Sequence, residues 1–299
     1  MAELMGAVSS GQHDERVAEG RGGAAVTSLE GTSEPGYGAG MLDHRIPAET
    51  RRLHALEEFA DPASRAALAN LGIQPGWRCL ELGGGTGSVA RWLAARCAPG
   101  ETVVTDLDTS LLPRDVPNLS VLVHDVTRDG FPDDSFDLVH ARLLLEHLPR
   151  PEEVLADMVR WTVPGGWVCV EGIRLLVPPG GARNAFHRCM DGVRAVAEGS
   201  MRANIRWATA LPYFLGQAGL REVDVSCTPG LVGQSGRATR FLQLTVELLG
   251  PALTEQGLVH PDDLTACTAL LNDGRYTDLA CLSVSAWGRK PPATPLPAG

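Results

Sequence analysis

Residues 77–97 read WRCLELGGGTGSVARWLAARC and carry the strongest structural signal of the chain. A short apolar run precedes the glycine-rich segment Gly83–Gly87, and residues with helical spacing follow it. Glycines let a backbone turn sharply and approach a ligand closely, while the first turn of the following helix presents unpaired N–H groups. The segment therefore predicts a strand, a ligand-binding loop and a helix, in this order.

The spacing of the glycines narrows the class of ligand. The loop reads G-x-G-x-G, and Ser88 stands where the dinucleotide fingerprint G-x-G-x-x-G has its last glycine. No GK[ST] follows, which excludes a P-loop. The pattern favours a nucleotide-like ligand, and a nicotinamide-dependent oxidoreductase becomes the weaker alternative.

Beyond this segment, apolar runs alternate with helical stretches, as in βαβ units. We expect strands at 102–108, 119–126, 136–147 and 167–172, with a helix at 151–162. Further helices are predicted at about 184–201, 208–218, 238–254 and 262–271, and two late strands at 223–227 and 281–288. Near-continuous apolar strands are typical of a parallel sheet that is buried on both faces. The pattern predicts an α/β fold with a seven-stranded, mostly parallel sheet and helices on both of its faces.

The chain divides into segments of different composition. Residues 1–40 are rich in Gly, Ser, Ala and Glu, which predicts disorder, and residues 41–76 predict a helical lid. Within this lid, one helix is expected over Pro47–Ala60, and Asp61-Pro62 predicts the start of a second that ends near Gly72. Residues 77–290 form the expected main domain, with cap insertions at about 174–220 and 230–275 and a flexible tail at 291–299.

Composition limits the partners and the compartment. The 299 residues are 44% hydrophobic and carry a net charge of −10, which argues against binding to a nucleic-acid backbone, although this charge also simply favours solubility. No apolar run approaches the roughly 18 residues of a membrane span, and no signal-peptide pattern is seen, so a cytoplasmic protein is expected. The seven cysteines contain no CxxC pair, which predicts free thiols and no metal site.

Glu81–Gly87 resembles motif I of the class I S-adenosylmethionine (SAM)-dependent methyltransferases, and the resemblance extends over roughly residues 45–175. It implies a Rossmann-like fold and SAM as cofactor. In this family an acidic residue at the position of Asp106 holds the ribose hydroxyls, and Asp125-Val126 resembles the adenine-contacting motif. The resemblance places the cofactor at Glu81, Gly83, Gly85, Gly87, Asp106, Leu107, Asp125, Val126, Ala141, Arg52 and Tyr37, with Arg52 on the SAM carboxylate.

Two side chains are candidates for acting on the methyl acceptor. Glu171 is expected at the carboxyl end of the fifth strand and His147 shortly after the fourth, where ligands sit in open α/β sheets. A histidine or a carboxylate there could guide or take the acceptor's proton. The alternatives are a salt bridge of Glu171 with Arg142 or Arg174, and a His147 that only hydrogen-bonds to the fold.

Other features have two interpretations each. His140, within a strand, is expected to be structural, although its strand approaches the cofactor. Arg52 is a cofactor ligand or a solvated surface arginine. Trp207, Tyr213 and Phe214 line a flat aromatic pocket or belong to the core.

Family analogy predicts a methyltransferase that acts on a small aromatic or heterocyclic secondary metabolite, with an oxygen, nitrogen or carbon acceptor. We expect this small molecule as the partner, and neither nucleic acid nor a membrane. The formation of a homodimer is left as an open alternative. The alternative from another class is a SAM-binding regulator or partner subunit without activity, since no catalytic side chain is obligatory for methyl transfer.

Overall fold

The computed structural model describes residues 45–176, 184–201, 203–204, 206–233 and 236–293. Its centre is a seven-stranded sheet in the order β3-β2-β1-β4-β5-β7-β6. The pairs from β3 to β5 are parallel, whereas β7 runs antiparallel to both of its neighbours. The strands are β1 (Cys79–Leu82), β2 (Thr102–Asp106), β3 (Leu119–Val123), β4 (Phe136–Arg142), β5 (Thr162–Leu175), β6 (Arg221–Gly233) and β7 (Thr277–Arg289). The predicted Rossmann-like, mostly parallel sheet is confirmed.

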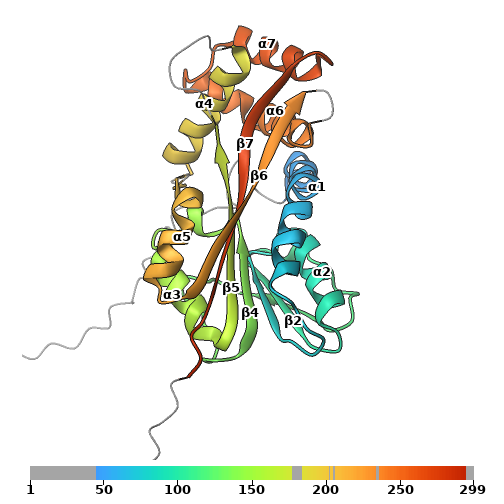
Figure 1. The fold of residues 1–299 in the computed structure, drawn as a ribbon. Helices are drawn as coiled ribbons and strands as arrows, with labels where there is room; N and C mark the ends of the chain where they lie inside the picture. The colour runs from blue at the N-terminus through green and yellow to red at the C-terminus, as the bar shows by residue number, and fades with distance from the viewer. Residues whose placement is uncertain (1–44, 177–183, 202, 205, 234–235, 294–299) are drawn as a thin grey trace, which may run out of the picture. The chain divides into compact units, whose positions relative to one another are not determined.

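Helices cover both faces of the sheet, as Figure 1 shows. The α-helices are α1 (Pro47–Asn70), α2 (Ser88–Cys97), α3 (Pro151–Trp161), α4 (Ala185–Gly199), α5 (Trp207–Gln217), α6 (Ala238–Glu255) and α7 (Pro261–Asn272). Leu68 of α1 and Leu93 of α2 share a core with Cys79 and Leu138, which defines the α1 face of the sheet. On the opposite face of the sheet, called the α5 face below, α3 and α5 pack in a core that includes Leu211. Side chains that alternate along a strand therefore enter different cores.

The α1 segment differs from the prediction of two helices. It forms one helix of 24 residues, and Pro62 lies inside it. Proline removes a backbone donor and usually kinks or ends a helix. Here, the helix packs on both sides of Pro62, because Leu53 and Leu68 are both buried, so tertiary packing outweighs the local signal. Gly72 follows the helix with φ +71°, as expected for a helix C-terminus.

The strands β5, β7 and β6 continue past the end of β4. Arg142, the last residue of β4, pairs with Glu171, and β5 then pairs only with β7, from Gly172 to Leu175. This part of the sheet carries α4, α6 and α7, which lie together at one end of the sheet in Figure 1. These helices and the first half of α1 form a core of their own. None of the helices in the described ranges is long and apolar enough to span a membrane.

Candidate functional site

The glycine loop, Gly83–Gly87, connects the buried end of β1 to α2. Gly85 has φ +57°, in the left-handed region that favours glycine, and a Cβ added there would meet no atom of the described residues within 4 Å. A Cβ on Gly84, by contrast, would lie 2.3 Å from Cγ2 of Val104. Gly84 is thus required for packing against β2, whereas Gly85 borders open space that a ligand can enter.

Asp106 ends β2 beside this loop. Its Oδ2 accepts a hydrogen bond of 3.0 Å from the backbone N–H of Gly85, and its Oδ1 accepts one of 3.2 Å from that of Asp108. The next side chain, Leu107, is apolar and 60% exposed. The structure thus brings the predicted ribose ligand, the glycine loop and an exposed apolar side chain together at the carboxyl ends of β1 and β2.

Asp125 and Val126 follow β3. The Asp125 carboxylate accepts hydrogen bonds from the N–H and the hydroxyl of Thr127, at 3.0 and 2.6 Å. These bonds, led by the one from the Thr127 hydroxyl, lower the pKa of Asp125. Val126 is buried. The carboxylate therefore caps its own turn, and its predicted contact with adenine stays a prediction.

Three further predicted cofactor residues have different surroundings. Arg52 is buried and forms an ion pair with Glu49 of the same helix, with Nη2 2.6 Å from Oε1, so the interpretation as a solvated arginine is wrong. Ala141 is buried in β4 between Leu82 of β1 and Val170 of β5. Tyr37 lies outside the described residues.

A row of buried polar side chains crosses the α1 face at the level of the glycine loop. Glu81 and His140 are partners in register on β1 and β4, and Oε2 of Glu81 accepts a hydrogen bond of 2.5 Å from His140 Nδ1. On the other side, His140 Nε2 lies 3.8 Å from Oε2 of Glu171, a distance for attraction between charges rather than a hydrogen bond. Burial opposes the charged imidazole, yet the two carboxylates raise the pKa of His140 to about 9. His140 is thus a buried cation between two acidic groups.

Cys169 adds a third donor atom to this row. Its Sγ lies within 4.8 Å of ligand atoms of His140 and Glu171, a set that could in principle hold a metal ion. Burial raises the pKa of the Cys169 thiol well above its ordinary value, and the neighbouring carboxylates raise it further. The protonated thiol is a poor metal ligand, and the charged His140 already supplies the positive charge that the carboxylates need.

Glu171 is covered by α1. Its Oε2 accepts a short hydrogen bond from the hydroxyl of Ser64. Burial opposes its charge, but His140, Arg142 and Ser64 together lower its pKa, so Glu171 is an anion. Oε1 of Glu171 is buried and has no hydrogen-bond partner in the described part of the chain. The positive charge of Arg142 thus stabilises the Glu171 carboxylate, whose Oε1 forms no hydrogen bond with the described residues.

Arg142 attaches α1 to the end of β4. Its Nη1 lies 2.9 Å from Oδ1 of Asp61 and 3.0 Å from the hydroxyl of Ser64. Asp61 also accepts a hydrogen bond of 2.9 Å from Ser88, the first residue of α2. The middle of α1 is therefore held over the glycine loop and the ends of β4 and β5 by buried polar contacts.

His147 ends the short 3-10 helix η3 (Leu145–His147), which follows β4. Burial, and after it the positive charge of Arg52, lowers the pKa of His147 to about 4. The imidazole is therefore neutral at neutral pH. His147 follows the end of β4, and Glu171 pairs with Arg142, the last residue of β4, but β5 continues to Leu175, so Glu171 is not at the end of its strand as predicted. The two side chains have opposite electrostatic surroundings.

Glu146 is a candidate that the sequence analysis did not single out. It is 7% exposed, and burial raises its pKa to about 8. Its Oε2 is buried without a hydrogen-bond partner among the described residues. The available signal was a single acidic residue within the apolar run Leu143–Leu148, at the end of a predicted strand.

The three aromatic residues of α5 divide between core and surface. Trp207 is buried and stacks on Phe214 with 4.1 Å between ring centroids, which agrees with the core interpretation. Tyr213 is 65% exposed. Trp207 and Phe214 thus belong to the core on the α5 face, whereas Tyr213 lies at the surface.

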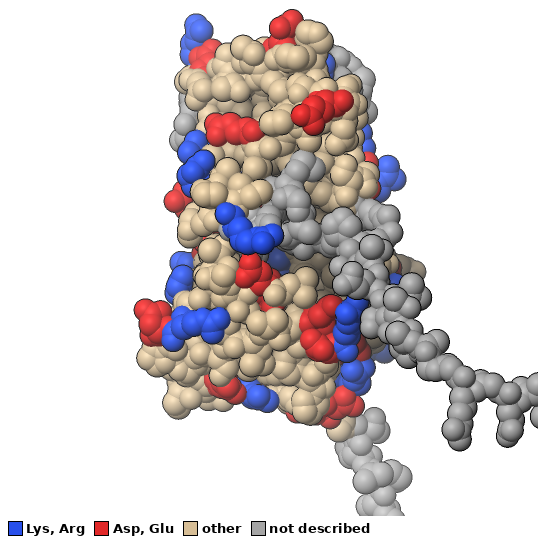
Figure 2. Space-filling model, turned by 180° about the vertical axis from the view of Figure 1, so that it is seen from behind, with Lys and Arg blue, Asp and Glu red and all other residues tan. Residues whose placement is uncertain are grey.

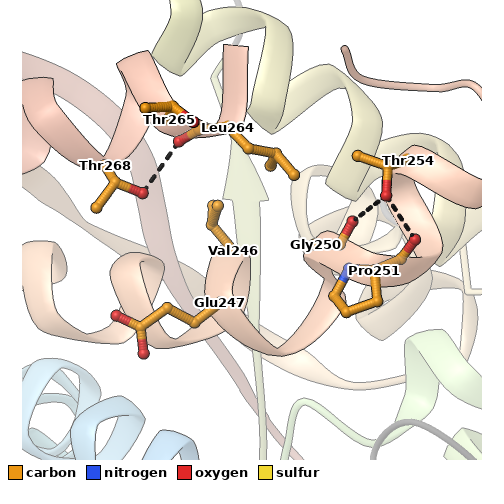
Figure 3. A pocket seen from close by; sticks show the side chains of 8 residues that line it. All are labelled: Val246, Glu247, Gly250, Pro251, Thr254, Leu264, Thr265 and Thr268. Atoms are coloured by element: carbon orange, nitrogen blue, oxygen red, sulfur yellow. Dashed lines mark hydrogen bonds between the residues drawn. The ribbon is translucent and has the colours of Figure 1, made fainter. Parts of the chain in front are cut away.

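A pocket of about 340 Å³ lies between α6 and α7. Figure 3 shows the side chains that line it. Its threonine hydroxyls are bonded to their own helices: Thr254 donates to the carbonyls of Gly250 and Pro251, and Thr268 to that of Leu264. No residue of the glycine loop or of the buried polar row lines it. The chemistry-bearing groups described above therefore belong to a different part of the fold.

Comparison with known proteins agrees with the geometry. Residues 80–170 match the family model described as a methyltransferase domain. A ubiquinone/menaquinone biosynthesis C-methyltransferase of Cupriavidus necator is 35% identical over 111 residues, which cover 34% of this chain and 46% of that protein. Its counterpart from Laribacter hongkongensis is 32% identical over 111 residues, again 34% of this chain and 46% of that protein. The match thus spans about half the length of these relatives.

Solved structures share the fold at low sequence identity. Phosphoethanolamine N-methyltransferase 2 of Haemonchus contortus, in complex with phosphomonomethylethanolamine and S-adenosylhomocysteine, has a TM-score of 0.55 and 16% identity, with 84% of this chain and 60% of that chain covered. The [4+2]-cyclase SpnF has a TM-score of 0.50 and 18% identity, with 78% and 82% covered. Because SpnF is named a cyclase, the same fold occurs in enzymes that catalyse different reactions.

Proposed function

We propose that this chain, which contains a class I SAM-dependent methyltransferase domain, transfers the methyl group of SAM to a small acceptor molecule. The observation that carries the proposal is the pairing of Gly85 with Asp106 beside open space. It combines a backbone that a ligand can approach with a carboxylate at the carboxyl ends of neighbouring parallel strands.

The surroundings of the glycine loop fit SAM. Asp106 is the acceptor for the ribose hydroxyls, because one carboxylate can accept hydrogen bonds from two vicinal hydroxyls. Leu107, exposed beside it, offers an apolar surface for the adenine ring, and Val126 lies after the neighbouring strand β3. The remaining predicted contacts of the cofactor are Glu81, Gly83, Gly87, Asp125, Ala141, Arg52 and Tyr37.

The relatives and the charge support an acceptor that is a small ring compound. The relatives' printed names concern the C-methylation of quinones, which makes an aromatic or heterocyclic metabolite the favoured substrate, with an oxygen, nitrogen or carbon acceptor. Figure 2 shows Lys and Arg interspersed with Asp and Glu on the face that it displays, as expected for a protein without a nucleic-acid partner.

SAM supplies an electrophilic methyl group on a sulfonium, and the protein's main task is alignment. Orientation of the reactants can lower a barrier by roughly 7–11 kcal/mol. Under this proposal, Glu171 orients or deprotonates the acceptor through Oε1, with the neutral His147 close to the same end of β4. The fixed contacts of Glu171 to Ser64 and His140 suit orientation, because they hold the carboxylate in one position.

Two measurements test the function. Calorimetric titration with S-adenosylhomocysteine and, separately, with NADH tests the cofactor. Mass spectrometry of a protein-free metabolite extract, incubated with the protein and methyl-labelled SAM, tests the activity. Binding of S-adenosylhomocysteine and a labelled product support the proposal; binding without any labelled product favours a SAM-binding regulator, and binding of NADH alone contradicts both.

A further inference from the structure

The two halves of the glycine loop are fixed in different ways. Gly84 donates its N–H to the carbonyl of Thr105 at 2.9 Å, and Gly85 donates to the carboxylate that ends β2, so strand β2 holds the first half. The turn from Gly84 to Gly87 is closed by one hydrogen bond of 2.8 Å. Three of its four residues are glycines, which adopt several backbone conformations at little cost, so this bond alone does not fix Thr86.

Side chains of α1 bind the second half of the loop. The hydroxyl of Thr86 donates a hydrogen bond to Oε1 of Glu57, and the hydroxyl of Ser88 donates one of 2.9 Å to Oδ1 of Asp61. Glu57 and Asp61 are four residues apart, so they lie on the same side of α1 and one turn from each other. Two carboxylates of α1 therefore bind the residues on either side of Gly87.

Glu57 fixes the side chain of Thr86. The Thr86 side chain is buried, and among the described residues Glu57 is the only hydrogen-bond partner of its hydroxyl. The other oxygen of Glu57, Oε2, lies 3.3 Å from Nδ1 of His54, one turn earlier in α1. The carbonyl of Thr86 accepts a hydrogen bond of 3.2 Å from Arg91 of α2. Thr86 is thus bound at its carbonyl from α2 and at its side chain from α1.

The docking of α1 on the sheet does not depend on Glu57. Asp61 forms an ion pair with Arg142 at 2.9 Å, and Ser64 donates a hydrogen bond to Glu171. These contacts lie one and two turns further along α1 than Glu57. Loss of the Glu57 carboxylate should therefore leave α1 in place and change only its contact with the glycine loop.

We propose that Glu57 is a positioning residue for the cofactor: through the hydroxyl of Thr86, it fixes the second half of the glycine loop in the conformation that binds SAM. The inference rests on the proposed function. A loop that is ordered before binding loses less conformational entropy when the ligand binds, and this raises the affinity. Glu57 should therefore act on the binding of SAM and not on the turnover of SAM that is already bound.

A double-mutant cycle tests the contact. Glu57→Ala removes the acceptor of the Thr86 hydroxyl, and Thr86→Val removes the donor while it keeps the branched shape of the side chain. In titration calorimetry, each variant should bind S-adenosylhomocysteine roughly tenfold more weakly than wild type, the factor expected for a hydrogen bond to a charged group. The double variant should bind no more weakly than either single variant, because all three lack the same bond. Glu58→Ala, at the exposed neighbour of Glu57, is the matched control.

Kinetics and thermal unfolding separate positioning from a structural role. In label transfer from methyl-labelled SAM into the protein-free metabolite extract, Glu57→Ala should raise the KM for SAM roughly tenfold, with the loss confined to KM. Its unfolding temperature without ligand should lie close to that of Glu58→Ala. A lower unfolding temperature with wild-type affinity would mean that Glu57 only anchors α1, and it overturns the inference.

The comparison of Thr86→Ser with Thr86→Val tests the same contact without any change in α1. Thr86→Ser keeps the hydroxyl and should recover the affinity for S-adenosylhomocysteine that Thr86→Val loses, so this pair decides the question even where Glu57→Ala fails to fold. Equal affinity of the two variants, or additive losses in the double variant, overturns the inference and leaves the methyltransferase proposal standing. Absence of S-adenosylhomocysteine binding by the wild-type protein overturns the proposed function, and the inference with it.

Discussion

Asp106 and Gly85 are joined by a hydrogen bond of 3.0 Å, so the carboxylate that ends β2 holds the backbone of the glycine loop directly. The same carboxylate is the proposed ribose acceptor. A change at Asp106 therefore acts on the ligand contact and on the loop that shapes the ligand site.

Asp106→Ala should weaken SAM binding. The loss of hydrogen bonds to a charged group costs about 1.5–3 kcal/mol, which corresponds to a roughly tenfold to hundredfold lower affinity. Asp106→Asn retains an acceptor oxygen for the N–H of Gly85 and should lose less. Titration calorimetry of both variants and of the exposed control Asp133→Ala measures the effect. Unchanged affinity in Asp106→Ala would show that this residue does not hold the ribose.

Gly85→Val and Gly84→Val should fail in different ways. At Gly85 the added side chain enters open space, at a backbone strain of about 1–2 kcal/mol, and should occupy the ligand's place in a folded protein. At Gly84 it should collide with Val104 and disturb the sheet. Circular dichroism and SAM titration should therefore find a folded, non-binding Gly85→Val and a strongly destabilised Gly84→Val. Normal SAM binding by Gly85→Val contradicts the assignment of the loop.

Arg142→Met should destabilise the protein, because it leaves the Asp61 carboxylate without its buried cation. Removal of one partner from a buried ion pair typically costs about 3–5 kcal/mol. Denaturant unfolding of this variant measures the loss, and Arg150→Met, which breaks the exposed pair with Glu153, is the control. Equal stability of the two variants would show that α1 is not held through Arg142.

The charge of His140 predicts a pH dependence of stability. Its pKa is raised in the folded protein to about 9, so its contribution is fully present below the unfolded value of about 6.5 and is lost as the pH rises through 9. His140→Gln should reduce the decline in unfolding free energy over this window. The ionisation of Glu146 adds to the decline below pH 8, so the comparison is best made in the Glu146→Gln background. An identical decline with and without His140 would mean that the imidazole is neutral in the fold.

Glu171→Gln tests the proposed role of Glu171 in orienting or deprotonating the acceptor. If Glu171 acts on the acceptor, turnover should fall by a factor of roughly 10²–10⁴ with nearly unchanged SAM affinity. A small fall in turnover with intact SAM binding would mean that the protein accelerates the reaction by aligning the reactants and not through Glu171. Parallel losses of binding and turnover would identify Glu171 as a part of the ion-pair network under α1.

The sequence predicted those parts of the fold that depend on local pattern. The β1–loop–α2 unit, the alternation that follows it and the two late strands were all found near their expected positions. Periodicity and glycine spacing report directly on which residues face a core and where a backbone must turn.

Contacts between distant segments were not predictable in this way. The Asp61-Pro62 signal indicated a helix start, but packing on both sides of Pro62 produced one helix. Ser64 and Glu171 are 107 positions apart, and only the docking of α1 on the sheet brings them together. For the same reason, the burial of Glu146 was not predicted: its sequence neighbours do not reveal that β5 and α5 pack around its carboxylate.

The continuity of α1 has a mechanical consequence. Leu53 and Phe59 belong to the core of α4, α6 and α7, while Leu68 and Leu71 belong to the core beneath β1 and α2. The helix thus contributes to two hydrophobic cores of one compact unit, and Asp61 and Ser64 near its middle contact Arg142 and Glu171. A shift of the first half of α1 relative to the second would therefore have to bend the helix near Pro62 or break the hydrogen bond between Ser64 and Glu171.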